Sequence, residues 1–164
     1  MTTTSISVER FSVRSSKPFG GVIKALEASV GHANLSTFMS EIASAKSYAD
    51  MENYVGTVTS ASGLMEFARF DLGAVLSKAH GEKAPRSVRF LIGNPLVMKR
   101  MVEHVPDAGS YAPVTILVDE RNDGVRLSYD RMASFLAAYG NESALKVARG
   151  LDAKIEALLQ AAAG

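Results

Sequence analysis

The chain has 164 residues, of which 47% are hydrophobic, and 18 basic against 17 acidic side chains give a formal net charge of +1. A chain of this length is about one domain and buries roughly 68–70% of the surface that its unfolded form exposes. The balanced charge argues against a nucleic-acid partner, which needs Lys and Arg clustered on one face. We therefore expect a single domain over residues 1–164.

The sequence contains no cysteine, which excludes disulfides, thiolate catalysis and Cys-based zinc sites. The N-terminus lacks the basic start and apolar run of a signal peptide. No window approaches 18 uninterrupted apolar residues, so we expect no membrane span and a cytoplasmic location. The histidines, His32, His80 and His104, lie in separate contexts without metal-ligand spacing. We expect no metal and no cofactor.

The N-terminal part is predicted as a strand and a helix. Apolar and polar residues alternate over residues 6–14, with one slip of parity at Arg10 that is typical of a bulge. Residues 15–18 have the Ser and Pro of a helix start. Apolar residues then recur at a spacing of three and four as far as Val30, which predicts a helix with one buried face.

Residues 32–62 are predicted to be an inserted helical segment. Asn34 or Ser36 can cap a first helix, and Asp50 can cap a second, shorter one. The small polar residues from 57 to 63 then predict a loop.

The middle of the chain is predicted as two strands with a polar connection. Leu64 to Asp71 reads as a strand, followed by a helical or irregular piece through Leu76. A polar loop over residues 78–87 contains Gly and Pro. The next strand is predicted from Val88 to Ile92.

Gly93-Asn94-Pro95 predicts a sharp change from strand to helix. Asn is a strong helix cap and Pro is favoured at the first helical position, so the tripeptide has a sufficient structural role. A helix N-terminus also offers free N–H groups and a partial positive charge. The same junction could therefore bind an anion or a carbonyl group.

The C-terminal half is predicted as a hairpin and two helices. Apolar runs within residues 114–129 flank Arg121-Asn122-Asp123-Gly124, a strong hairpin signal. Asp130 is predicted to cap a helix that stops at Gly140, and Asn141 to cap the last helix. Together these elements predict an α+β fold: one antiparallel sheet of four to five strands, with helices mainly on one face.

Four segments resemble the bacterial and archaeal family called domain of unknown function 302: Phe67–Gly73, Ile92–Pro95, Pro106–Pro113 and Ser128–Asp130. The resemblance covers roughly Leu64 to Tyr139. It implies a fold similar to half of the TATA-binding protein, a curved sheet in the order β-α-β-β-β-β-α backed by helices. It also implies a tendency to form homodimers, but fold similarity does not imply DNA binding.

The chain departs from its relatives at positions that could carry chemistry. Many members of that family have Cys where this chain has Asn94 and Val114, and some have His where it has Leu72. Thiol or metal chemistry is therefore not carried over to this sequence.

Three functions are compatible with these residues. The first is a small-molecule-binding domain with a pocket between the sheet and the inserted helices. Its expected polar contacts are Asn94, Tyr111 and Tyr129, and its expected apolar wall is Phe67, Met98 and Met101.

The second is a hydrolase or isomerase, with Asp71 as general base and the helix N-terminus at Asn94 stabilising an oxyanion. The third is a structural module whose exposed sheet pairs with itself in a homodimer.

Overall fold

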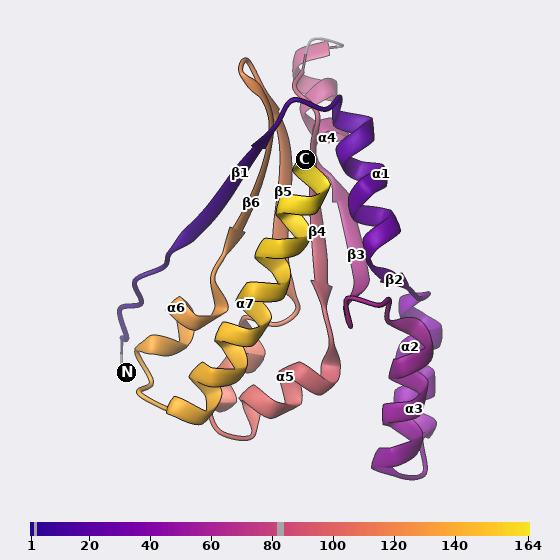
Figure 1. Ribbon diagram of the computed structural model, residues 1–164, viewed down its shortest axis with the longest axis vertical. Helices are drawn as coiled ribbons and strands as arrows, with labels where there is room; N and C mark the ends of the chain where they lie inside the picture. Colours follow the sequence, from indigo (N-terminus) through magenta and orange to yellow (C-terminus); the bar gives the residue numbers. More distant parts are fainter. Residues whose placement is uncertain (2, 82–83) are drawn as a thin grey trace.

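The structure, a computed structural model, describes residues 1, 3–81 and 84–164. These residues form an α+β fold with one six-stranded sheet, seven α-helices and a 3-10 helix (Figure 1). The fold class expected from the sequence is confirmed. The strands are β1 (Arg10–Ser15), β2 (Gly31–His32), β3 (Met65–Asp71), β4 (Ser87–Gly93), β5 (Val114–Arg121) and β6 (Gly124–Asp130). The helices are α1 (Phe19–Ser29), α2 (Leu35–Ser44), α3 (Tyr48–Val58), α4 (Leu72–His80), α5 (Pro95–Val102), η2 (Pro106–Ser110), α6 (Met132–Ala137) and α7 (Glu142–Ala163).

The sheet has the strand order β1-β6-β5-β4-β3-β2. Its strands pair antiparallel except for β2, which runs parallel to β3. The expected sheet of four to five antiparallel strands is therefore corrected to six strands of mixed direction. The extra strand is only two residues long. It forms because the chain leaving α1 passes beside β3, where the Gly31 N–H donates to the Leu64 carbonyl at 2.9 Å.

The first strand is shorter than predicted. It begins at Arg10, opposite Asp130, and has no bulge at that point. Its partner β6 ends at Asp130 and the chain then turns toward α6, so Glu9 has no paired residue in β6. Instead the Arg131 N–H donates to the Glu9 carbonyl at 2.9 Å.

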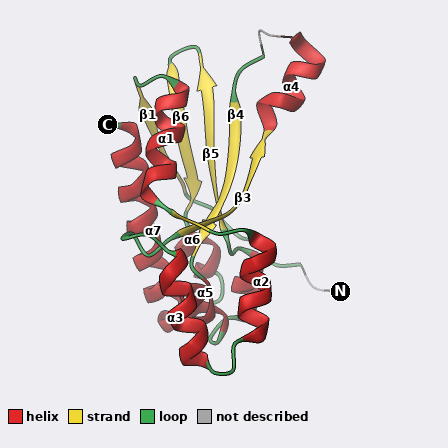
Figure 2. Cartoon of the chain, turned by 90° about the vertical axis from the view of Figure 1, so that its right-hand side faces the viewer, coloured by secondary structure: helices red, strands yellow, loops and turns green. Residues whose placement is uncertain are grey.

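Two helices cover one face of the sheet. Figure 2 shows α1 and α7 on the same side of the strands, and both helices contact the sheet and each other. Side chains at alternate positions of β4, β5 and β6 enter this layer, because successive side chains of a strand point to opposite faces. Phe90, Ile116 and Leu127 are completely buried there. The main core is therefore the layer between the sheet and these two helices.

The predicted helical segment after residue 32 is a pair of helices, α2 and α3, which extend past the end of the sheet (Figure 1). Asn34 caps α2, as predicted. The cap of α3 is Ser47 and not the predicted Asp50, whose N–H donates to the Ser47 hydroxyl at 3.1 Å. The pair has a small core of its own, centred on Phe38, Val55 and Met65.

The predicted hairpin is confirmed, since β5 and β6 pair with Arg121 opposite Gly124. Asn141 caps α7, also as predicted, and its side chain accepts the Ala144 N–H at 3.0 Å. α7 supplies the longest apolar stripe of the main core, which includes Leu151, Ile155 and Leu159.

Gly31 offers a test of how tightly β2 is held. A β-carbon at Gly31 would lie 1.9 Å from the Val58 carbonyl oxygen, whereas one at Gly20 would meet nothing within 4 Å. Overpacking of this kind costs about 1–3 kcal/mol. Chemical denaturation should show a loss of that order for Gly31→Ala. Gly20→Ala should be neutral or stabilising by up to about 1 kcal/mol, because Ala is the better helix former. Equal stabilities would contradict the close approach of β2 to α3.

Candidate functional site

The helices α1 and α7 cover one face of the sheet, and we call the opposite face the open face. Strand register aligns side chains across this open face in rows. One row runs from β1 to β3 through Ser12, Ser128, Leu117, Arg89 and Phe70. In the next row Arg10 lies opposite Asp130, and Thr115 lies opposite Leu91. The open face therefore combines arginines, hydroxyls and leucines.

An open pocket of about 210 Å³ lies on these rows, and we call it the sheet-face pocket. Its lining comes from β1, β4, β5, β6 and the first residue of α4: Arg10, Leu72, Arg89, Thr115, Leu117, Ser128, Tyr129 and Asp130. Four strands and the start of a helix thus place side chains around one small volume.

Ser128 is one of the residues that line this pocket. The residue is only 6% exposed, and its strand neighbours Leu127 and Tyr129 are buried on the core side, so its hydroxyl points to the open face. Among the described residues nothing hydrogen-bonds to that hydroxyl, although it lines the pocket. Ser128 is therefore a polar group available to a ligand.

The two arginines of the pocket differ in their surroundings. Arg10 donates to both carboxylate oxygens of Asp130, at 2.6 and 2.8 Å, and this hydrogen bonding raises the pKa of Arg10. Arg89 instead stacks over the Phe70 ring, 5.1 Å from its centroid. Within the described chain no acidic side chain forms an ion pair with it. The cation available to a ligand is therefore Arg89.

A second hollow, of about 300 Å³, adjoins the pocket and shares Thr115 and Asp130 with it. Tyr111 lines this hollow, with its ring stacked on Phe135 at 4.7 Å between centroids. The Tyr111 and Tyr139 hydroxyls lie 2.9 Å apart, and this hydrogen bond is the main cause that raises the pKa of Tyr139 to about 12. Of the residues predicted to contact a ligand, Tyr111 borders this hollow, and Tyr129 borders the sheet-face pocket although its side chain is buried in the core.

Asn94 is occupied by the protein itself. Its side-chain oxygen accepts the Leu96 N–H at 2.8 Å and caps α5, and its amide donates to the Gly63 carbonyl at 2.8 Å. The structural role predicted for Gly93-Asn94-Pro95 is thus present. Both polar ends of the Asn94 side chain are engaged without a ligand.

The remaining predicted contacts do not converge. Met101 and the ring of Tyr129 are buried in the main core, whereas Phe67 packs edge-on against Phe38 in the core of α2 and α3, at 5.6 Å. Met98 is half-buried on α5. None of the best-formed pockets of the described residues lies between the sheet and the inserted helices.

Asp71 and Asn94 lie at opposite ends of the β3–β4 pair. Asp71 is opposite Val88, whereas Gly93, which precedes Asn94, is opposite Met65. Five residues of strand separate the two ends by roughly 17 Å. The Asp71 carboxylate accepts the Ala74 N–H at 2.8 Å and caps α4. The structure therefore does not bring Asp71 and the Asn94 helix N-terminus together at one point.

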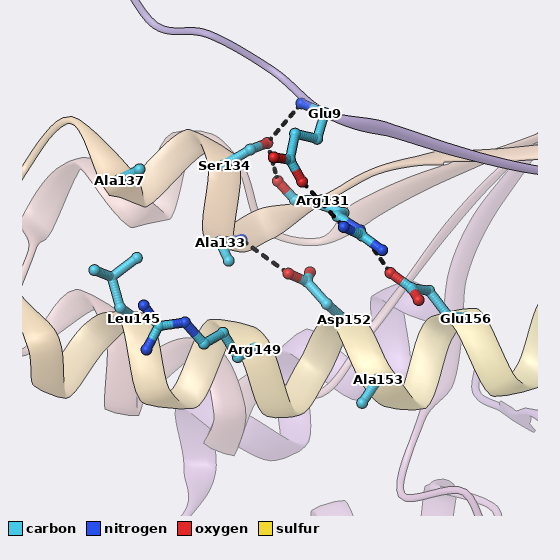
Figure 3. A pocket seen from close by; sticks show the side chains of 10 residues that line it. All are labelled: Glu9, Arg131, Ala133, Ser134, Ala137, Leu145, Arg149, Asp152, Ala153 and Glu156. Atoms are coloured by element: carbon cyan, nitrogen blue, oxygen red, sulfur yellow. Dashed lines mark hydrogen bonds and ion pairs between the residues drawn. The ribbon is translucent and has the colours of Figure 1, made fainter.

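The largest of these pockets, about 480 Å³, lies between α6 and α7 beside Glu9 (Figure 3). Arg131 lines this pocket and forms ion pairs with Glu156 at 2.7 Å and with Glu9 at 3.0 Å. The Ser134 hydroxyl accepts the Glu9 N–H and donates to the Arg131 carbonyl. These charged and hydroxyl groups are engaged with one another.

Asp152, at the back of this pocket, holds the N-terminus of α6. Its carboxylate accepts the Tyr129 hydroxyl at 2.6 Å, the Met132 N–H at 2.8 Å and the Ala133 N–H at 3.1 Å. The predicted cap, Asp130, is instead the ion-pair partner of Arg10. The sequence carried a signal for this residue. Asp152 falls on the apolar stripe of α7, where only a carboxylate with buried partners is expected.

The pKa of Asp152 gives a test of this cap. Burial raises this pKa above its ordinary value of 3.8, against the opposing effect of its hydrogen bonds. The folded state then binds the proton more tightly than the unfolded state, so this group reduces stability as pH rises above 3.8 toward the raised pKa. Asp152→Asn cannot titrate and loses one acceptor, at a cost of about 1 kcal/mol. Its deficit in unfolding free energy should be largest at acid pH and shrink as pH rises. The exposed Asp107→Asn is the control, and a deficit that grows with pH would contradict the assignment.

Within the described residues, no group of three or more His, Asp or Glu side chains is placed to hold a metal ion. A search of their helices for a stretch long and apolar enough to cross a bilayer also finds none.

Comparison with known proteins identifies the family. No curated protein matches the sequence significantly. The crystal structure of an uncharacterized conserved DUF302 protein from Bacillus stearothermophilus has a similar fold, with a TM-score of 0.66 and 13% sequence identity. The similarity covers 93% of this chain and 97% of that one. The family model described as domain of unknown function DUF302 matches residues 40–162. The resemblance expected from the sequence is confirmed, and the chain belongs to the DUF302 family.

Proposed function

We propose that this protein is a small-molecule-binding domain and that its site is the sheet-face pocket. The observation that carries the proposal is the Ser128 hydroxyl, which lies in a residue only 6% exposed, lines the pocket and has no protein partner among the described residues. A ligand in the pocket could hydrogen-bond to that hydroxyl.

The lining of the pocket suits a ligand of mixed character. Leu72 and Leu117 supply apolar surface, and Thr115 and Arg89 supply polar groups beside Ser128. Ligand sites are typically concave, mostly apolar and provided with a few convergent polar groups. The volume of about 210 Å³ is small for such a site. It suits a compact ligand, or one end of a longer ligand whose other end occupies the hollow beside Tyr111.

Ser128→Ala tests this proposal, with Ser12→Ala as its matched control. Ser12 lies opposite Ser128 in the same row and is exposed outside the pocket. We expect a thermal-shift screen of metabolites and lipids to find compounds that stabilise the protein. For those compounds Ser128→Ala should weaken binding about fivefold, the equivalent of one hydrogen bond near 1 kcal/mol, and Ser12→Ala should not. A screen without stabilising compounds, or equal affinities of the two variants, would overturn the proposal.

Homodimer formation is the second candidate function. Four large apolar side chains lie exposed where β3 meets α4: Phe70 at 46%, Leu72 at 37%, Val75 at 69% and Leu76 at 37%. Neighbouring exposed apolar side chains of this kind mark interaction surfaces. A second copy of this chain is the partner that we propose for them.

Light scattering coupled to size exclusion tests this second proposal. The chain mass is 17.5 kDa, and a dimer has twice that value. Val75→Glu places a charge in the exposed group but outside the sheet-face pocket, and it should shift the protein to the monomer. Val8→Glu is the control, because Val8 is also exposed, at 42%, but lies in the N-terminal segment. A strictly monomeric wild-type protein would contradict the dimer.

A further inference from the structure

We infer that the ligand of the sheet-face pocket is a monocarboxylate with an apolar body, which pairs with Arg89 through its carboxylate and also contacts Ser128. The inference rests on the proposed function and adds to it the chemical class of the ligand. Its physical basis is the combination, in one pocket, of a guanidinium without an acidic partner and a hydroxyl without a protein hydrogen-bond partner among the described residues.

Arg89 is prepared for a planar anion. Its guanidinium stacks over Phe70, an arrangement that occupies one face of the group and leaves its edge N–H donors free. Those donors form a fork that matches the two oxygens of a carboxylate. At the other arginine of the pocket, Arg10, the carboxylate of Asp130 occupies this position. In the described residues no such side chain is paired with Arg89.

Ser128 and Arg89 line the same pocket. They belong to one row of the open face, with Leu117 of β5 between them. Two strand spacings separate their Cα atoms by roughly 10 Å, and the Arg89 guanidinium lies over Phe70 of β3, the strand on the other side of β4 from Ser128. A ligand that places its carboxylate at Arg89 can therefore extend over Leu117 and contact Ser128.

The charge of the lining favours one negative charge over two. The charged residues of the lining are Arg10, Arg89 and Asp130, so two cations and one anion leave +1. Because Arg10 and Asp130 neutralise each other, the remaining charge is that of Arg89. A dianionic phosphate would find one cation for two charges, together with an aspartate nearby. The single negative charge of a monocarboxylate matches the single positive charge of Arg89.

The rest of the ligand is expected to be apolar. Leu72 and Leu117 line the pocket itself, and the adjoining hollow offers Met132 and Phe135, with Tyr111 stacked on the latter. A short aliphatic chain or an aromatic ring extending from the carboxylate would bury these surfaces. Short-chain fatty acids and aromatic monocarboxylates are thus the ligand class.

An NMR titration of the isotope-labelled protein tests the inference with four probes: hexanoate, benzoate, hexanamide and inorganic phosphate. A ligand the size of hexanoate typically binds with a Kd of about 1 mM. We expect hexanoate and benzoate to shift the amide signals of Thr115, Leu117 and Ser128. Hexanamide should bind at least about tenfold more weakly because it lacks the charge-assisted bonds to Arg89, and phosphate should bind at least about tenfold more weakly because it has no apolar body to bury.

Substitution of Arg89 separates its charge from its shape. Arg89→Gln should weaken hexanoate binding by about tenfold or more, and Arg89→Lys should fall between wild type and Gln, since Lys keeps the charge but not the fork. Arg14→Gln is the control, because Arg14 is exposed on the same face but lies outside the pocket lining. Unchanged spectra away from the substitution show that each variant folds.

The possible outcomes separate this inference from the proposed function. If hexanamide binds as well as hexanoate, and binding depends on Ser128 but not on Arg89, the ligand is not recognised through a carboxylate. The inference is then overturned, whereas the proposal that the sheet-face pocket binds a ligand is supported. If phosphate binds best in an Arg89-dependent manner, the ligand class is a phosphate instead. If none of the four probes shifts the pocket signals, the inference is overturned. The proposed function then depends on whether the metabolite screen finds a ligand sensitive to Ser128→Ala.

Discussion

Burial of one face of the sheet under α1 and α7 is the constraint on which the rest of the structure depends. Strand side chains alternate between the two faces of the sheet. Because Phe90, Ile116 and Leu127 point into the core, the residues next to them along each strand point to the opposite face. Arg89, Leu117 and Ser128 become neighbours for that reason, although they come from three strands. The sheet-face pocket is a consequence of the register that builds the core.

A second constraint ties the C-terminal helices to this sheet. Asp152 of α7 accepts hydrogen bonds from the start of α6 and from the hydroxyl of Tyr129. A single buried carboxylate thus fixes a strand end, a short helix and a long helix relative to one another. α6 has no side-chain cap of its own, and it contributes Met132 and Phe135 to the hollow beside the pocket. The position of that hollow therefore depends on Asp152.

Membership of the DUF302 family establishes the kinship and the fold, and the site chemistry is a separate question. The two helix caps that looked most like catalytic groups, Asp71 and Asn94, are used to start α4 and α5. The groups without a protein partner among the described residues, Ser128 and Arg89, are instead not among the residues that the sequence predicted for a site. Functional interest thus shifts from the strand-to-helix junctions to the middle of the open face.

The sequence by itself determined the α+β class, the β5–β6 hairpin and the caps at Asn34, Asn94 and Asn141, because turns and caps depend on residues a few positions apart. It also determined the family, through motifs that mark those same junctions. It could not reveal the short strand β2, the identity of the groups that Asp152 caps or the pocket at Ser128. Each of these joins residues far apart in the chain, and only strand register and helix packing decide which distant side chains share a face. A serine between two buried strand residues becomes a candidate ligand group only when its row is known.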